Sequence, residues 1–290
     1  MLTILEGPDG GGKTTFAEWL FRRHNHLTSH HGPYPASERI AAHYWLDMPI
    51  GNSPRVFDRS WLSEAIYAEA WRKQPSRLRV YERRMLERIA LSKQVVVAKI
   101  QPPFELCVAQ WSARKKSEYV QNAHAFEHVY GLYQELRTDL PIVTLDDVEP
   151  DYPSWLELLD ETRAAFNPSP GIGNPQASTL LVGDRVSAGR WQNDWPFCAD
   201  SGCSPWLAEV LEEAGIPESR LYWANAVSST GQPLEFDWIE RHNFARIIAL
   251  GNVAFNALGD FCPSRIPHPQ FHRRFRSSEP YELIEILKGA

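Results

Sequence analysis

Residues 7–14 read Gly-Pro-Asp-Gly-Gly-Gly-Lys-Thr, and this stretch decides the fold of the first half of the chain. It follows an apolar run, LTILEG at residues 2–7, and opens an amphipathic run, KTTFAEWLFRRH at residues 13–24. Glycines let backbone N–H groups converge on phosphate oxygens, and a following helix adds the positive end of its dipole. The pattern GxxxxGK[ST] between a strand and a helix therefore predicts a loop that binds nucleotide phosphates.

Two side chains at the end of this stretch carry chemistry in this interpretation. The Lys13 ammonium reaches the β- and γ-phosphates, and the Thr14 hydroxyl binds Mg²⁺. The sequence therefore predicts ATP and Mg²⁺ as cofactors, and a glycine-rich turn that merely caps a helix is the alternative. The predicted nucleotide-binding residues are Gly7, Pro8, Asp9, Gly10, Gly11, Gly12, Lys13, Thr14 and Thr15.

Composition sets the class of protein. The 290 residues are 43% hydrophobic and 23% charged, which is typical of a globular chain of about two domains. A net charge of −6 excludes a generally basic nucleic-acid binder, so contact with nucleic acid needs a local patch. No apolar run approaches the ~20 residues that span a bilayer, and the N-terminus lacks the charged region of a signal peptide. The four cysteines form no CxxC pair, which favours reduced thiols in a cytoplasmic protein.

A seam rich in proline and glycine, NPSPGIGNPQ at residues 167–176, separates two regions that each alternate apolar strands with helices. Short apolar strands joined by helices predict an α/β fold with a parallel sheet covered on both faces. The predicted domains are residues 1–166 and 178–290, with a linker at 167–177. The predicted strands are residues 2–7, 55–60, 94–100 and 141–147 before the seam, and 178–184, 220–227 and 245–251 after it.

The glycine loop has the character of a known family. A Glu-Gly pair precedes Asp-Gly-x-Gly-Lys, as in the thymidylate kinases, which the chain resembles over about residues 1–165. Asp58-Arg59 resembles the Asp-Arg motif that ends a strand in that family. ARKKSEYV (residues 113–120) resembles its basic lid, and FEHVYGLYQEL (residues 126–136) resembles the helix after the lid. The resemblance implies a P-loop kinase fold.

The resemblance assigns roles outside the loop. Asp58, at the end of a strand, holds Mg²⁺ through water or orients the acceptor hydroxyl, and Arg59 offers a planar fork to phosphate oxygens of the acceptor. Arg114 and a neighbouring lysine close over the γ-phosphate, and in similar kinases the position of Asp9 faces the acceptor sugar. A surface ion pair at 58–59 and a solvated helix face at 114–116 are the alternatives. The predicted catalytic residues are Lys13, Asp58, Arg59 and Arg114, and the predicted metal ligands are Thr14 and Asp58.

Four histidines, His24, His26, His30 and His31, follow the first predicted helix. No cysteine or carboxylate stands beside them at the spacing of a metal site. The sequence therefore favours a polar surface loop near the acceptor site, with a metal centre as the alternative.

Residues 178–290 resemble the uracil-DNA glycosylase superfamily, especially its short prokaryotic and mismatch-specific branches. The resemblance rests on the order of several short segments, none of them specific alone. It implies a second α/β domain that binds DNA. The segments are VGD (residues 182–184), Pro196-Phe197, YWANAV (residues 222–227), IIALGNVAFNALG (residues 247–259) and HPQFHRRF (residues 268–275).

Residue by residue, the resemblance implies a pocket for an extruded base. Phe197 stacks on the base, the Asn225 amide reads its polar edge, and His268 shapes the pocket near the sugar. Arginines interleaved with phenylalanines supply a local basic patch for phosphates. A core phenylalanine, an asparagine that satisfies a turn and a solvated arginine tail are the alternatives. The predicted DNA- and base-binding residues are Phe197, Asn225, His268, Arg273, Arg274 and Arg276.

This region departs from the glycosylases where they cleave the base. They need an acid followed by Pro-Gly, whereas residues 183–187 read GDRVS, with Asp184 as the acid and no Pro-Gly. Gln270 replaces the serine of the second motif, and the cysteines of the iron–sulfur branch are missing. These departures favour base flipping and DNA binding over cleavage.

A kinase joined to a base-flipping domain suggests an acceptor within DNA. Thymine has no hydroxyl group but 5-hydroxymethyluracil has one, and the fusion resembles the phage 5-hydroxymethyluracil DNA kinases, which act on the way to hypermodified thymidines. The expected partners are ATP and DNA carrying a modified pyrimidine, without a membrane, in the cytoplasm of an infected bacterial host. A nucleoside monophosphate kinase with an accessory domain is one alternative. A glycosylase or lesion-binding protein with a regulatory P-loop is the other.

Overall fold

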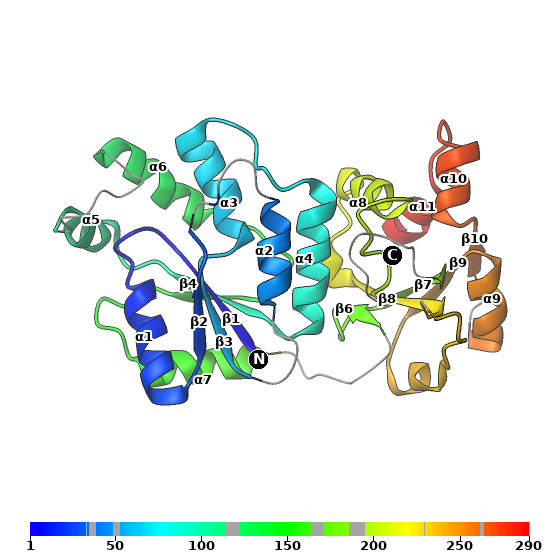
Figure 1. Ribbon diagram of the computed structural model, residues 1–290, viewed down its shortest axis with the longest axis horizontal. Coiled ribbons are helices and arrows are strands. Elements are labelled where there is room, and N and C mark those ends of the chain that lie inside the picture. Colours follow the sequence, from blue (N-terminus) through cyan, green and yellow to red (C-terminus); the bar gives the residue numbers. More distant parts are fainter. Residues whose placement is uncertain are drawn as a thin grey trace. The chain divides into compact units, whose positions relative to one another are not determined.

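The computed structural model shows two compact units, each built on one five-stranded sheet (Figure 1). One unit comprises residues 1–79 and 93–163, and the other comprises residues 80–92 and 164–290. No helix in the described part is long and apolar enough to cross a membrane. The structure describes residues 1–32, 34, 39–48, 53–113, 122–163, 171–185, 195–228, 230–261 and 264–289.

The first unit has a fully parallel sheet in the order β2-β3-β1-β4-β5, with helices packed against it. This arrangement, typical of P-loop kinases, confirms the predicted fold class. Its strands are β1 (Leu2–Glu6), β2 (Leu27–His30), β3 (Arg55–Asp58), β4 (Val96–Ile100) and β5 (Ile142–Leu145). Its helices are α1 (Lys13–His24), α2 (Ile40–Asp47), α3 (Trp61–Tyr67), the π-helical η1 (Ala68–Arg72), α5 (Phe104–Ser112), α6 (Ala123–Gln134) and α7 (Tyr152–Thr162).

The apolar pattern explains how these elements pack. β1 and β4 are buried along almost their whole length, as continuous apolar runs in central parallel strands require. α1 directs Phe16 and Leu20 onto the sheet, where α7 adds Trp155 and Leu159 to the same core. β2 was not predicted, because its sequence LTSH has no apolar alternation and the strand lies at the sheet edge beside β3 alone.

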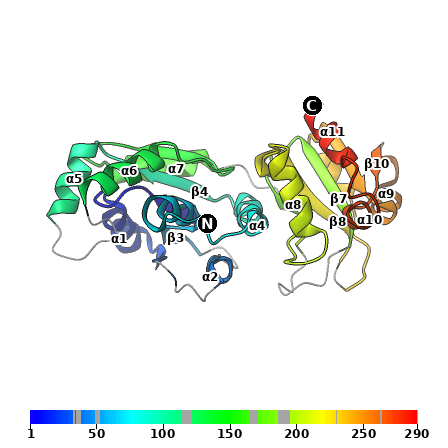
Figure 2. The same ribbon diagram turned by 90° about the horizontal axis from the view of Figure 1, so that it is seen from above.

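The second sheet has the order β10-β9-β7-β8-β6, and its strands are parallel except for β6, which runs antiparallel to β8. Figure 2 shows α8 on one side of β7 and β8 and α9 on the other. The strands are β6 (Ile172–Gly173), β7 (Thr179–Arg185), β8 (Leu221–Val227), β9 (Arg246–Leu250) and β10 (Ser264–Ile266). The helices are α4 (Val80–Ser92), α8 (Ser204–Glu213), α9 (Asn252–Leu258), α10 (Pro269–Phe275) and α11 (Glu282–Lys288), with 3-10 turns at Glu218–Arg220, Asp237–Arg241 and Gly259–Phe261.

Helix α4 precedes β4 in the sequence but belongs to the second unit, where it packs against α8, β6 and the turn Glu218–Arg220. Residues 80–92 fall within the first predicted domain, 1–166. The physical reason for the difference is that α4 buries charged side chains, Arg84 and Arg88, whose acidic partners lie more than a hundred residues downstream. Local sequence pattern does not reveal such partners.

Candidate functional site

The predicted phosphate loop connects β1 to α1 at the carboxyl edge of the first sheet. Gly7 and Gly10 have φ angles of 142° and 77°, in the region that favours glycine. A Cβ at Gly7 would lie 2.0 Å from the carbonyl oxygen of Ile100, so the loop packs directly on the end of β4. Gly12 precedes α1 and has no side chain to cap it, which leaves the first N–H groups of the helix available to an anion.

Lys13 folds back over this loop. Its ammonium donates to the carbonyl oxygens of Gly7 at 2.8 Å and Pro8 at 2.7 Å. Burial, reinforced by the charge of Arg59, lowers the pKa of Lys13 to about 8, and nearby carboxylates oppose the shift. A lysine held this close to the loop can neutralise phosphates bound there.

Thr14 and Asp58 meet between the start of α1 and the end of β3. The Thr14 hydroxyl donates to Asp58 Oδ2 at 3.0 Å, and Nδ1 of His30 lies 3.2 Å from the same oxygen. Burial alone would raise the pKa of Asp58, but the hydrogen bond from His30 and the charges of Lys13 and Arg59 lower it to about 2. Asp58 is therefore ionised at neutral pH.

The donor set around Asp58 suits Mg²⁺. Asp58 Oδ1 is buried and has no hydrogen-bond partner in the described part of the chain. Mg²⁺ commonly takes one or two protein oxygens and completes its shell with water and substrate phosphates. One carboxylate and the Thr14 hydroxyl beside a phosphate loop fit that requirement.

Arg59 and Asp9 form an ion pair across the mouth of the site. The guanidinium also donates to the Tyr133 hydroxyl at 3.0 Å and lies 4.9 Å from the centre of the Tyr67 ring. The Tyr67 hydroxyl donates to the other Asp9 oxygen at 3.2 Å. Arg59 has a φ of 74°, which is a strained backbone for a non-glycine residue, and these contacts hold it there. The Arg59 side chain is 12% exposed and the Asp9 side chain is 7% exposed, so this is not a surface ion pair.

Glu6 is a buried glutamate that binds the residues following Arg59. No role was predicted for it from the sequence. Glu6 accepts hydrogen bonds from the Ser60 N–H at 2.8 Å, the Ser60 hydroxyl at 2.6 Å and the Ser63 hydroxyl. The Tyr133 hydroxyl lies 3.3 Å from Glu6 and 2.9 Å from Ser63. Burial raises the pKa of Glu6, although the two serines oppose that shift. The network fixes the segment that follows Arg59.

A pocket opens beside Arg59 in the first unit. The empty space within it is about 550 Å³, part of which is open to solvent. Three tyrosines and two histidines line it, together with Glu64, which pairs with Arg72 and Arg77. The described lining residues are His30, His31, Gly32, Tyr34, Tyr44, Arg59, Ser60, Ser63, Glu64, Tyr67 and Arg72.

Glu64 and Arg72 were not predicted as site residues from the sequence. A signal existed, since Glu64 and Arg72 stand eight residues apart in a predicted helix and so face the same side. Two of the four histidines, His30 and His31, line the pocket. No group of three or more His, Cys, Asp or Glu residues is arranged to hold a metal within the described ranges. Arg114 and the rest of the predicted lid, residues 114–120, lie outside the described residues.

In the second unit, Phe197, Asn225 and His268 lie together around Gly183 of β7. The Phe197 and His268 rings are stacked with centroids 6.3 Å apart. A Cβ at Gly183 would lie 2.6 Å from the Phe197 ring and 2.8 Å from Asn225 Oδ1, so glycine is needed there. Asn225 is only 2% exposed, and its Nδ2 has no hydrogen-bond partner among the described residues. A buried amide with an unused donor beside an aromatic ring can read the edge of a planar base.

His268 and Asp184 both cap helices next to this cluster. His268 Nδ1 accepts from the Gln270 N–H at 3.1 Å, at the start of α10. Burial lowers the pKa of His268, although Asp184 opposes the shift, so the neutral ring carries its proton on Nε2. Asp184 Oδ1 accepts from the Ala254 N–H at 2.9 Å in α9. One oxygen of Asp184, the acid that was compared with the glycosylase motif, is thus engaged with a helix.

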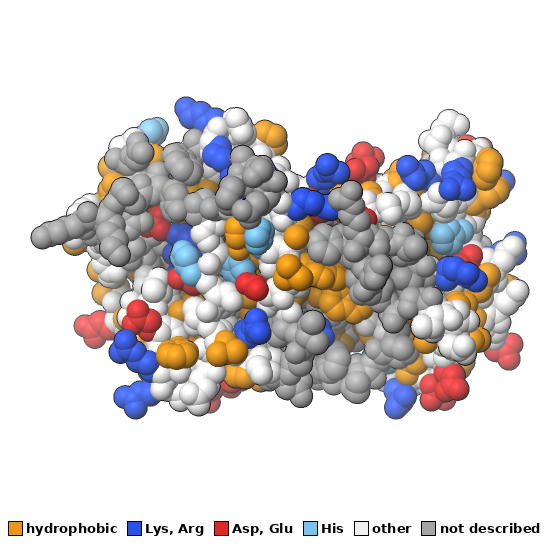
Figure 3. All heavy atoms as spheres, in the orientation of Figure 1, with side chains coloured by type: hydrophobic (Ala, Val, Ile, Leu, Met, Phe, Trp, Pro, Cys, Tyr) orange, Lys and Arg blue, Asp and Glu red, His pale blue; other side chains and the backbone are white. Residues whose placement is uncertain are grey.

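The predicted basic patch lies on α10 and the residue after it. In Figure 3, Lys and Arg side chains gather over α10 beside apolar ones. Phe275 is 71% exposed and Phe271 is 45% exposed, and Arg276 lies 5.9 Å from the centre of the Phe271 ring. Arg273 also donates to the carbonyl oxygen of Gly202 at 2.9 Å. The predicted residues Arg273, Arg274 and Arg276 are all exposed.

Comparison with known proteins gives only distant structural likenesses. No family model and no curated protein matches the chain. The YorR protein of Bacillus subtilis, in complex with phosphorylated GDP, is similar over 57% of this chain and 100% of its own, with 20% identity and a TM-score of 0.45. Deoxyadenosine kinase of M. mycoides with bound dATP is similar over 55% of this chain and 100% of its own, with 14% identity and a TM-score of 0.39.

Proposed function

We propose that this chain is an ATP-dependent kinase. The observation that carries the proposal is the approach of Thr14 to Asp58 within 3.0 Å, with Lys13 beside them and a pocket adjoining Arg59. Phosphoryl transfer requires mainly positioning and neutralisation of charge, and these four side chains supply both.

The transfer step follows from this geometry. The acceptor hydroxyl oxygen forms a bond to the γ-phosphorus while the bond from that phosphorus to the β–γ bridging oxygen breaks, so ADP leaves. The hydroxyl proton is released to water. Lys13 neutralises the phosphates and Arg59 orients the acceptor. The resemblance to thymidylate kinases assigns Arg114, which lies outside the described residues, to the γ-phosphate. Mg²⁺, which Thr14 and Asp58 would hold, supplies further charge neutralisation when bound.

The acceptor in this proposal is the hydroxymethyl group of 5-hydroxymethyluracil within DNA. The second unit supports it, because the Asn225 amide has an unused donor near Phe197, whose ring stacks on His268. We call these three residues the proposed base slot. Arg273, Arg274 and Arg276 add positive charge for the DNA backbone on a chain that is acidic overall. We place this reaction in the cytoplasm of an infected bacterial host, as a step in thymidine hypermodification.

A free nucleoside or nucleotide is the second candidate acceptor. The pocket beside Arg59 is lined by Tyr34, Tyr44 and Tyr67, whose rings can stack on a nucleobase, and this observation favours that alternative. Base cleavage is disfavoured, because the Pro-Gly that follows the acid in the glycosylases is absent after Asp184.

Transfer of a labelled γ-phosphate from ATP distinguishes these acceptors. The chain is incubated with a duplex containing 5-hydroxymethyluracil, with a matched thymine duplex and with free nucleotides, and the products are digested to nucleosides. Label on hydroxymethyl-deoxyuridine from DNA supports the proposal. Label on free nucleotide alone, or abasic sites formed without ATP, would overturn it.

Substitutions test whether phosphoryl transfer and DNA binding depend on separate sites. Lys13→Ala should lose transfer and keep DNA binding, since Lys13 lies in the phosphate loop of the first unit. Lys93→Ala, an exposed lysine between α4 and β4, is the matched control. Loss of DNA binding in Lys13→Ala at unchanged stability would argue against separate sites.

A further inference from the structure

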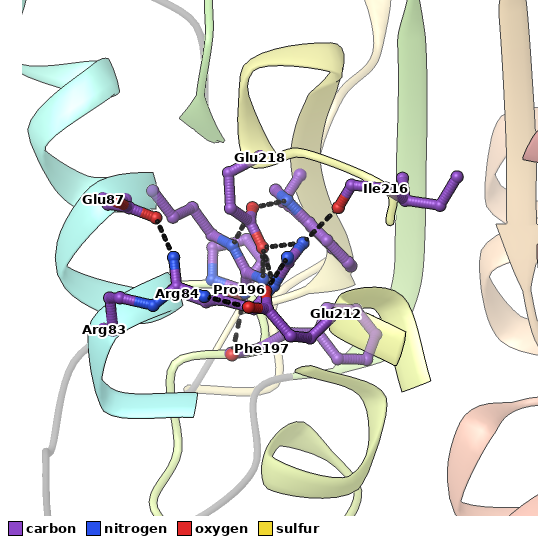
Figure 4. Close-up of polar contacts among 10 residues, drawn as sticks. Arg83, Arg84, Glu87, Pro196, Phe197, Glu212, Ile216 and Glu218 are labelled. Atoms are coloured by element: carbon purple, nitrogen blue, oxygen red, sulfur yellow. Dashed lines mark hydrogen bonds and ion pairs between the residues drawn. The ribbon is translucent and has the colours of Figure 1, made fainter. Parts of the chain in front are cut away.

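Arg88 of α4 reaches the loop that carries Phe197. Its Nη1 donates to the carbonyl oxygen of Phe197 at 2.9 Å and lies 3.4 Å from that of Pro196. Figure 4 shows the polar network that surrounds this contact, with Glu218 at its centre. The residue thus joins a helix encoded within the first half of the chain to the base slot of the second unit.

The Arg88 guanidinium is held rigidly. Its Nε and Nη2 donate to the two oxygens of Glu218 at 3.0 and 2.8 Å, and Glu218 also accepts from Trp223 Nε1 at 3.0 Å. The guanidinium stacks on the Trp223 ring at 3.9 Å. Arg88 is 2% exposed and Glu218 is 0% exposed, so water does not compete for these bonds. A planar fork fixed on two sides presents its remaining N–H groups in a defined direction.

Phe197 needs such support. Its φ of 53° lies in the left-handed region, which is strained for an aromatic residue. Its ring packs on Trp223 at 5.2 Å, beside His268 at 6.3 Å, and fills the space above Gly183. Arg88 therefore supports Phe197 in two ways. It donates a hydrogen bond to the Phe197 backbone, and it stacks on Trp223, the ring against which the Phe197 ring packs.

We propose that Arg88 is a positioning residue for the base slot and acts through Phe197. The inference rests on the proposed base-binding function. Arg84 provides the comparison, since it is on the same helix, equally buried at 2%, and also donates to Glu218 at 3.0 Å. Its other bonds run to Glu212 and to the Ile216 carbonyl, away from the Phe197 loop.

Arg88→Lys and Arg84→Lys form a matched pair in the full chain, because both keep the charge beside Glu218 and lose the fork. Hydrogen–deuterium exchange of a peptide covering residues 195–200 reports on the loop without DNA. Arg88→Lys should speed exchange in that peptide, whereas Arg84→Lys should leave it at the wild-type rate. Equal effects of the two variants, or no change in Arg88→Lys, would overturn the proposal whatever the substrate proves to be.

Binding to 5-hydroxymethyluracil and thymine duplexes then tests the action through Phe197. Arg88→Lys should lower the preference for the modified duplex by about 10-fold, the size of one charge-assisted hydrogen bond. On a Phe197→Ala background the same change should cost nothing further. Independent, additive losses would contradict action through Phe197. Wild-type binding without any preference would instead refute base recognition, and the exchange result would still stand.

Discussion

The Thr14 hydroxyl donates a 3.0 Å hydrogen bond to Asp58, across 44 residues, and so joins the phosphate loop to the end of β3. β3 pairs in parallel with β1, with Leu5 opposite Asp58, which brings the carboxylate to the edge where the loop begins. The remaining Asp58 oxygen is buried and unpaired within the described ranges. The proposed magnesium site is therefore a product of strand pairing as well as of the loop.

Replacing Thr14 tests the proposed metal site. Thr14→Val keeps the shape of the side chain and removes the hydroxyl, whereas Thr14→Ser keeps the hydroxyl. We expect Thr14→Val to lower the transfer rate by about 100-fold at limiting Mg²⁺, since a lost ligand near developing charge costs a few kcal/mol. Initial rates measured over a Mg²⁺ titration check this. The same Mg²⁺ dependence in both variants would contradict the assignment.

The pKa of Asp58 predicts a pH dependence of stability. The folded value of about 2 lies below the ordinary 3.8, so the contribution is fully present above pH 3.8 and disappears as the pH falls from 3.8 toward 2. Its size above that window is about 2 kcal/mol. Urea unfolding without Mg²⁺ should show a wild-type advantage over Asp58→Asn that shrinks below about pH 4. Asp146→Asn, at an exposed aspartate, is the control, and a pH-independent difference for Asp58→Asn would refute the prediction.

The close packing around Gly183 allows a steric test of the proposed base slot. Gly183→Ala would place a methyl group 2.6 Å from the Phe197 ring and 2.8 Å from Asn225 Oδ1. We expect the preference for modified DNA to fall by about 10-fold or more, while ATP binding is unchanged. Gly131→Ala is the control, because a Cβ there meets no atom within 4 Å. Competition binding with both duplexes provides the measurement, and an unchanged preference in Gly183→Ala would count against this slot.

We expect replacement of Glu218 to lower the free energy of unfolding strongly. Glu218→Gln removes the negative charge between two buried guanidinium groups, Arg84 and Arg88. Breaking a buried ion pair by removing one partner costs about 3–5 kcal/mol. Urea unfolding followed by tryptophan fluorescence should register this loss, and Glu213→Gln on the exposed side of α8 should not. Equal stability of the two variants would contradict the role of Glu218 in holding α4.

The sequence predicted the parts whose structure depends on residues close to one another in the chain. The strand–loop–helix of residues 2–24 follows from glycine conformational freedom and from the apolar spacing of Phe16 and Leu20, which are properties of a short segment. The edge strand β2 escaped prediction, because pairing with β3 and not its own composition makes it a strand.

The candidate sites were predicted only in part, for a related reason. Motif residues such as Lys13 and Asn225 can be listed from the sequence, and their roles remain predictions. The support of Glu6 for Ser60 and Ser63 is invisible in the sequence, because it depends on which side chains converge from different elements. The same holds for the pocket walls formed by η1 and the end of β2.

By itself, the sequence determined a glycine-rich loop between a strand and a helix, an α/β architecture and a second α/β region, since each depends on local periodicity and turn chemistry. Only the tertiary structure decided that Thr14 meets Asp58, that Arg59 turns toward Asp9, and that α4 joins the second unit. The burial of charged side chains explains why α4 joins the second unit. Arg84 and Arg88 cannot be buried without an anion, and Glu218, which supplies it, is brought to them only by folding.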